Sequence, residues 1–234
     1  MANVDPIRRA EIGREKRART RSHLVAAASS LFARQAVESV TVDDVIKEAG
    51  VAKGTFYVHF ADLHALAVAV AQDLIQSFDE LLQPGRLSIS EPALRIAFGC
   101  SCFIDKALDD PGWARVVARM ATAAPNGLDV VRSRFLEDVR RFSKGLPQGG
   151  APPEVSLEIV SGIMLQLLGA FAEGRLTRRH REEAVGAILR AIGLDAKQVN
   201  SVVARPPASK DGAPALAPSK SSKPRRRPSA GDAT

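Results

Sequence analysis

Residues between Lys53 and His59 combine side-chain types that bind a polyanion with small residues that allow close approach. Lys53, Tyr57 and His59 carry an amine, a phenol and an imidazole, all of which donate hydrogen bonds to phosphate oxygens. Gly54 and Thr55 leave room for another molecule at the same surface. The segment therefore predicts a contact with the phosphate backbone of a nucleic acid.

Two short helices joined by a tight turn are expected to position this surface. Thr41 and Asp44 have the spacing of a capping box, which would begin the first helix. Gly50 stands where the chain must turn through a left-handed conformation. The apolar face of the first helix is formed by Val42, Val45, Ile46 and Ala49. Residues 41–60 thus predict a helix-turn-helix, whose second helix enters the major groove of DNA.

The surface predicted to contact DNA has few groups that distinguish one base pair from another. Its residues are Thr41, Val42, Ala52, Lys53, Gly54, Thr55, Phe56, Tyr57 and His59. We expect Ala52, Gly54, Thr55 and Phe56 to face base edges. Phosphate contacts are expected from Lys53, Tyr57 and His59, and from the hydroxyl or backbone of Thr41 and Thr55. Because no Arg, Asn or Gln is present, sequence preference should depend on methyl contacts and DNA shape. A helical hairpin without a nucleic-acid role is the alternative, and Gly54 and Thr55 disfavour it.

The same region resembles the TetR family of bacterial transcriptional regulators. The resemblance is carried by Arg21, Leu24, Ala27, Ala28, Leu31, Phe32, Thr41, Ala49, Gly50, Val51, Gly54, Thr55, Tyr57, His59 and Phe60. It covers only the N-terminal third of the chain. It implies an all-α fold, with a three-helix DNA-binding head followed by a helical bundle for ligand binding and dimerisation.

Three residues depart from the family pattern. Ala36 stands where the family usually has glycine, and Ile46 occupies a position that is usually a small alanine. Leu63 replaces a lysine commonly found at the start of the fourth helix, which removes one expected phosphate contact.

Breaks in the helical pattern and shifts in composition divide the chain into four segments. We expect a basic arm at residues 1–16, a DNA-binding domain with a connecting fourth helix at 17–83, a ligand-binding and dimerisation domain at 84–204, and a disordered basic tail at 205–234. The first helix should span about residues 17–35. The fourth should begin after Asp62 and end before Pro84 and Gly85. Further helices are predicted at residues 91–108, 112–123, 128–146, 154–173, 177–192 and 195–204.

The net charge of +7 is concentrated at the two ends of the chain. Residues 1–23 carry seven basic and three acidic side chains, and residues 205–234 carry seven basic and two acidic side chains. Such segments are suited to a polyanion. For the tail, two interpretations remain open: sequence-independent DNA affinity, or a solubilising extension.

The body has apolar positions that fit either a ligand cavity or an ordinary core. The candidates are Phe98, Cys102, Phe103, Trp113, Val117, Met120, Phe135, Met164 and Leu168. The resemblance favours a cavity, since members of the family commonly bind a small effector there. The few polar groups on these helices indicate an apolar ligand.

The last two long helices carry more apolar surface than one packing face requires. These residues are Ile159, Ile163, Leu167, Phe171, Val185, Ile188, Leu189 and Ile192. Excess apolar surface is usually buried in another subunit, and the resemblance implies a four-helix bundle across a two-fold axis. We therefore expect a homodimer.

Other classes of site are not indicated. The four histidines show no metal spacing, and Cys100 and Cys102 are expected in the core rather than in a disulfide or a redox sensor. No catalytic motif or cofactor motif is present, so neither an enzyme nor a cofactor is expected. The longest apolar run, residues 159–172, falls short of the roughly 20 residues that span a bilayer. The N-terminus is charged and has no apolar signal segment, which indicates a cytoplasmic protein that does not associate with a membrane.

These observations predict a homodimeric, DNA-binding transcriptional regulator, specifically a repressor that leaves a palindromic operator when a small apolar effector binds. The alternative is an effector-independent regulator or activator, which a filled body cavity would favour. An α-helical enzyme is the third hypothesis, and convergent titratable groups in the body would favour it. The sequence does not identify the operator, the target genes or the effector.

Overall fold

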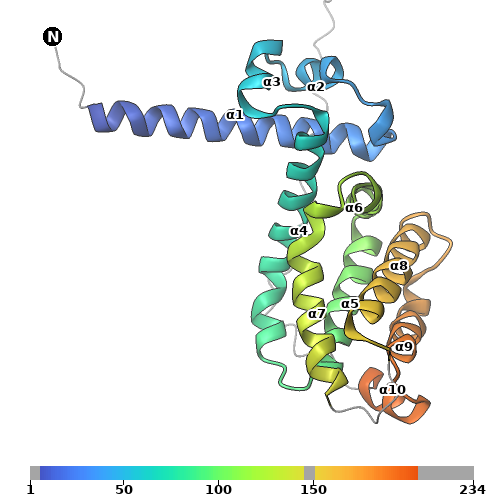
Figure 1. Cartoon of the computed structure of the whole chain (residues 1–234). Helices are drawn as coiled ribbons and strands as arrows, with labels where there is room; N and C mark the ends of the chain where they lie inside the picture. The colour runs from blue at the N-terminus through green and yellow to red at the C-terminus, as the bar shows by residue number, and fades with distance from the viewer. Residues whose placement is uncertain (1–5, 145–150, 205–234) are drawn as a thin grey trace, which may run out of the picture.

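The computed structural model describes residues 6–144 and 151–204, in which all regular secondary structure is helical. Figure 1 shows a head formed by α1, α2, α3 and the beginning of α4, and a body formed by the rest of α4 and the other helices. The all-α prediction is confirmed. The helices are α1 Pro6–Arg34, α2 Val42–Ala49, α3 Lys53–His59, α4 Leu63–Leu87, α5 Pro92–Asp109, α6 Pro111–Ala123, α7 Asp129–Ser143, α8 Pro153–Ala172, α9 Arg181–Ala191 and α10 Ala196–Val203. Three 3-10 turns separate them: η1 Val37–Ser39, η2 Pro125–Leu128 and η3 Arg178–His180.

Thr41 and Gly50 begin and end α2 as predicted, and Asp62 begins α4 as predicted. Asp44 N–H donates to Thr41 Oγ1 at 3.2 Å, and Thr41 N–H donates to the Asp44 carboxylate at 2.9 Å, so a capping box begins α2. Gly50 follows α2 with a φ of 64°, where a side chain would be strained. Asp62 caps α4 by accepting a hydrogen bond from Ala65 N–H at 2.7 Å.

Helix α1 begins at Pro6, not near Arg17 as predicted. Proline suits the first turn of a helix, and the Arg, Lys, Glu and Ala residues after it are strong helix formers. The apolar stripe used for the prediction begins only at Leu24, so it could not reveal the polar half of the helix. The predicted basic arm is therefore helical from Pro6 onward.

Helix α4 continues through Pro84 to Leu87 instead of ending before the proline. The proline ring removes one backbone hydrogen bond, close to the end of the helix. Ser88 completes the last turn, because its N–H donates to the Pro84 carbonyl at 3.3 Å and its hydroxyl donates to the Gly85 carbonyl at 2.7 Å. Gly85 is a packing position: an added Cβ would lie 2.7 Å from Cζ of Phe98.

Head and body have separate clusters of buried apolar side chains, and two helices belong to both. Helix α4 contributes Leu66 to the head cluster and Ile75 to the body cluster. Helix α6 contributes Met120 to the head cluster and Val117 to the body cluster. A displacement of α4 or α6 within the body would therefore disturb packing in the head.

The predicted dimer surface is wrong for α9 and the end of α8. Five of its eight residues are buried within the protomer: Phe171, Val185, Ile188, Leu189 and Ile192. Helix α9 packs against α5, α8 and α10, so its apolar side chains are covered on more than one side. Ile159 remains exposed, and Ile163 and Leu167 are half-buried, all on α8.

Helix α8 corrects a second expectation. By length and composition its 20 residues could cross a membrane, although we expected the apolar run to be too short. In the structure it is a central helix of the body, in contact with α5, α6, α7 and α9. Leu157, Val160 and Leu168 are buried by those neighbours.

The other body helices lie within a few residues of their predicted positions. Residue 177 does not begin α9, because η3 precedes that helix. Asp195 and Gln198 form a capping box at α10, with bonds of 2.8 and 2.9 Å. The predicted basic tail, residues 205–234, and residues 145–150 lie outside the described part of the chain.

Candidate nucleic-acid interface and body cavity

One face of α3 is open to solvent and carries most of the residues predicted to contact DNA. Lys53, Gly54 and Tyr57 are exposed on α3, and the adjacent Ala52 is exposed at its N-cap. The predicted residues that are half-buried are Val42, Thr55 and His59. Thr41 is exposed at the start of α2.

The prediction that Phe56 faces base edges is wrong. The Phe56 side chain is fully buried, and its ring packs edge-on against Tyr57, with 5.2 Å between centroids, and at a tilt against Phe60, with 6.0 Å between centroids. Phe60, which directly follows α3, is also buried among the apolar side chains of the head. Phe56 therefore anchors α3 to the head core.

Val58 is an exposed residue of α3 that the sequence analysis missed. Its side chain is 72% exposed, and it shares the open face with Lys53, Gly54 and Tyr57. The signal was available, since Val58 is four residues after Gly54 and so on its side of a helix. Its methyl groups are suited to contact with a thymine methyl group.

Lys53 and Thr41 have partners within the head. Lys53 Nζ lies 3.0 Å from Asp43 Oδ1, and this hydrogen bond raises the pKa of the amine. Both side chains are largely exposed, so the pair is weak and a phosphate can replace Asp43. The Thr41 hydroxyl donates to Asp44 at 2.7 Å, and this bond lowers the pKa of the Asp44 carboxyl.

The body contains a cavity of about 130 Å³ lined by residues of α4, α5, α7 and α8. Four predicted residues line it: Phe98, Phe103, Phe135 and Met164. A second cavity of about 110 Å³ is lined by Val117 and Leu168, and it shares Phe103 and Met164 with the first.

Cys102, Trp113 and Met120 were predicted to line a cavity, but they line neither of these two. Trp113 is buried in the body core against Phe78 and Phe103, with ring centroids at 5.1 and 5.8 Å. Met120 belongs to the head cluster. Cys100 lines the larger cavity instead of Cys102.

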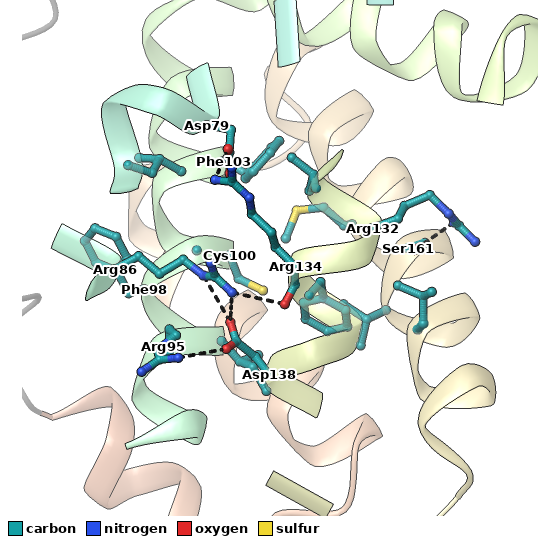
Figure 2. A pocket seen from close by; sticks show the side chains of 18 residues that line it. Asp79, Arg86, Arg95, Phe98, Cys100, Phe103, Arg132, Arg134, Asp138 and Ser161 are labelled. Carbon is teal, nitrogen blue, oxygen red and sulfur yellow. Dashed lines mark hydrogen bonds and ion pairs between the residues drawn. The ribbon is translucent and has the colours of Figure 1, made fainter. Parts of the chain in front are cut away.

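Charged residues form one wall of the larger cavity, which the sequence analysis did not predict. The Asp138 carboxylate is buried and accepts hydrogen bonds from Arg86 Nε at 3.1 Å and Nη2 at 2.7 Å. It also accepts from Arg95 Nη1 at 3.2 Å. Figure 2 shows these three side chains converging from α4, α5 and α7. The network was hidden because its members lie far apart in the sequence.

A second pair extends the charged wall. Arg134 Nη1 donates to the carboxylate of Asp79, which also accepts from Gln83 Nε2 at 3.1 Å. Arg86 links the two groups by donating from Nη2 to the Arg134 carbonyl at 3.0 Å. The cavity thus combines apolar walls with one edge that can donate and accept hydrogen bonds.

The two cysteines are free thiols. Burial raises the pKa of Cys100 and of Cys102 to about 12, so both stay protonated at neutral pH. Among the described residues, no group of three or more His, Cys, Asp or Glu side chains is arranged to hold a metal ion.

Residues 24–70 match the family model described as "Bacterial regulatory proteins, tetR family". The chain is 24% identical over 170 residues to the HTH-type transcriptional repressor DhaR of a Mycobacterium species, covering 69% of this chain and 85% of DhaR. It is 33% identical over 52 residues to the HTH-type regulator YvdT of Bacillus subtilis, a match spanning 22% of this chain and 27% of YvdT.

The fold extends this similarity beyond the head. The solved structure of RolR with the ligand resorcinol superposes with a TM-score of 0.64 at 24% identity, covering 82% of this chain and 96% of RolR. At that identity the superposition establishes the fold alone. The match at residues 24–70 thus identifies the head, from α1 to the start of α4, as a domain of the tetR family of bacterial regulatory proteins, and the body shares its helical architecture with RolR.

Proposed function

We propose that this protein is a homodimeric repressor that leaves a palindromic operator when a small molecule occupies the cavity between α4, α5, α7 and α8. One observation carries the proposal: a cavity in the body is lined in part by α4, and α4 continues into the DNA-binding head. The two heads of a dimer must lie at the spacing of the two operator half-sites. A ligand that binds more tightly to a body conformation in which the heads lack this spacing therefore lowers DNA affinity.

The size of the cavity favours an effector of about one ring. Its volume of about 130 Å³ is similar to that of an engineered apolar cavity of about 150 Å³ that binds benzene. Phe98, Phe103 and Phe135 supply aromatic walls. RolR, whose structure holds resorcinol, supports an effector of this size.

The charged wall favours an effector with at least one oxygen substituent. Among the described residues, the Arg134 guanidinium donates only to Asp79, which leaves further N–H donors for a ligand. A hydroxyl or carboxylate at this edge could accept from Arg134 without breaking the Asp138 network. A ring without oxygen would leave these polar groups unsatisfied when water is displaced. This refines the apolar effector expected from the sequence.

Helix α6 offers a route from body to head. Val117 of α6 lines the second cavity, while Arg119 Nη1 donates to the carbonyls of Phe32 and Gln35, the latter at 2.7 Å. Those carbonyls end α1, where a helix has unpaired acceptors. A shift of α6 on ligand binding would therefore move the end of α1.

The open apolar stripe of α8 supports dimerisation. Val155 and Ile159 are exposed, and Ile163 and Leu167 follow at helical spacing with half-buried side chains. We propose that this stripe, without the buried side chains of α9, forms the apolar part of the interface with a second copy.

The test begins with DNA fragments that the protein selects from genomic DNA. Operator affinity is measured by fluorescence anisotropy with phenol, resorcinol, benzoate or toluene, and ligand binding is followed through Trp113 beside Phe103. We expect at least one oxygen-bearing ring to weaken operator binding, and toluene to act less.

A matched pair of variants assigns the effect to the cavity. Arg134→Ala should reduce the response to the effector, whereas Arg141→Ala, which removes an arginine from the solvent face of α7, should keep it. If both variants respond like the parent protein, the effector does not bind at this wall. If no ring-sized molecule changes fluorescence or operator affinity, the effector-independent regulator is favoured.

A further inference from the structure

The N-terminal half of α1 is a helix without a protein partner. Residues 8–19 are all exposed, and Figure 1 shows this half projecting beyond the head. It carries Arg8, Arg9, Arg14, Lys16, Arg17 and Arg19, against Glu11 and Glu15. None of these six basic side chains makes an ion pair or hydrogen bond with another described residue. We call this surface the α1 extension.

The α1 extension is not built to pack against protein. Seven residues before the buried Leu24, on the same face of the helix, stands Arg17. At the same spacing, Arg21 and then Arg14 precede the buried Ala28. The face that is buried in the head is therefore basic outside it. A basic helix that is open on all sides is suited to a polyanion rather than to an apolar groove.

The position of the α1 extension relates it to α3. The guanidinium of Arg21 lies 5.1 Å from the centroid of the Phe60 ring, and Phe60 directly follows α3. The extension thus leaves the head next to the end of α3. Because it is continuous with the packed half of α1, the head holds it in a defined direction.

We propose that the α1 extension binds the phosphate backbone of DNA flanking each operator half-site. This rests on the proposed operator binding by α3. Residues 8–19 span about 18 Å at about 1.5 Å per residue, which corresponds to about five base pairs of DNA. The extension lengthens the bound DNA and adds affinity that does not depend on flanking sequence.

The experiment compares two duplexes: a minimal operator, and the same operator with ten base pairs of arbitrary sequence on each side. The variant carries Arg8→Ala, Arg9→Ala and Arg14→Ala, and alanine preserves the helix. The control removes three exposed arginines of the body with Arg140→Ala, Arg141→Ala and Arg175→Ala. Circular dichroism verifies that all three proteins have equal helicity.

We expect the parent and control proteins to bind the flanked duplex at least tenfold more tightly than the minimal one at low salt. The variant should bind the minimal operator within a factor of about two of the parent and lose the gain from flanking DNA. Its salt slope on the flanked duplex should fall by about five, because six phosphate contacts disappear per dimer.

Two outcomes would overturn the proposal. In one, the parent gains nothing from flanking DNA. In the other, the variant keeps the full gain in affinity from flanking DNA, which would assign that gain to another part of the chain. Failure of the parent to prefer the minimal operator over random DNA would instead contradict operator binding by α3, so the two proposals fail separately.

Discussion

At the scale of single residues, neighbouring positions of α3 have opposite surroundings. Phe56 is fully buried, while Tyr57 is 53% exposed, although the two rings touch. The helix turns about 100° per residue, so one aromatic ring enters the head core and the next faces outward. Aromatic character alone does not distinguish an anchor from a contact residue, but helical position does.

Substitution of these two residues should separate stability from DNA binding. Phe56→Ala should lower the free energy of unfolding by about 3–5 kcal/mol, because it leaves a cavity in the head core. Tyr57→Ala should change stability little but weaken operator binding. Thermal unfolding and anisotropy titrations measure the two effects. An unchanged operator affinity for a folded Tyr57→Ala protein would contradict the assignment of α3 as the recognition helix.

The thiols provide a second test at this scale. With the pKa of Cys100 and Cys102 raised to about 12, the reactive thiolate is scarce at pH 8 in the folded protein. A thiol reagent should modify both cysteines slowly under native conditions and rapidly in denaturant. Rapid native modification would contradict their burial and revive a redox role.

At the scale of secondary-structure elements, α4 and α6 matter because each contributes to two cores. Leu66 and Ile75 lie on opposite sides of the boundary between head and body, as do Met120 and Val117. Side chains in a close-packed interior do not move independently. The connection between cavity and head thus depends on shared helices, and Arg119 adds polar contacts to it.

Arg119→Ala should weaken the link between effector and operator. Removing the guanidinium leaves the last carbonyls of α1 without their partner from α6. In the parent protein, operator binding changes the affinity for the effector, and effector binding changes the affinity for the operator by the same factor. We expect this factor to be smaller in the variant. Measuring effector affinity with and without operator tests this. Arg119→Lys keeps the charge, so it should retain part of the coupling; full coupling in the alanine variant would exclude this route.

At the scale of the whole molecule, the exposed stripe of α8 sets the expected assembly. Ile163→Arg should favour the monomer, because an unpaired charge would be buried at the proposed interface. Leu189→Ala should instead destabilise the protomer by about 2–5 kcal/mol, since Leu189 is fully buried within it. Light scattering across a dilution series distinguishes these effects. A parent protein that is monomeric at micromolar concentration would contradict the dimer.

The sequence by itself determined the helical class of the fold and the local geometry of the head. Capping by Thr41 and Asp62 and the turn at Gly50 depend on neighbouring residues, so local pattern was sufficient to predict them. The polar half of α1 was missed because helix formation there produces no apolar stripe.

Only the tertiary structure decided which apolar residues face a cavity, the core or solvent. Leu189 and Ile159 have similar side chains, but one is covered by neighbouring helices and the other is not. The Asp138 network joins Arg86, Arg95 and Asp138 from three helices. Such burial and pairing arise from contacts between residues distant in sequence, which helical periodicity does not specify.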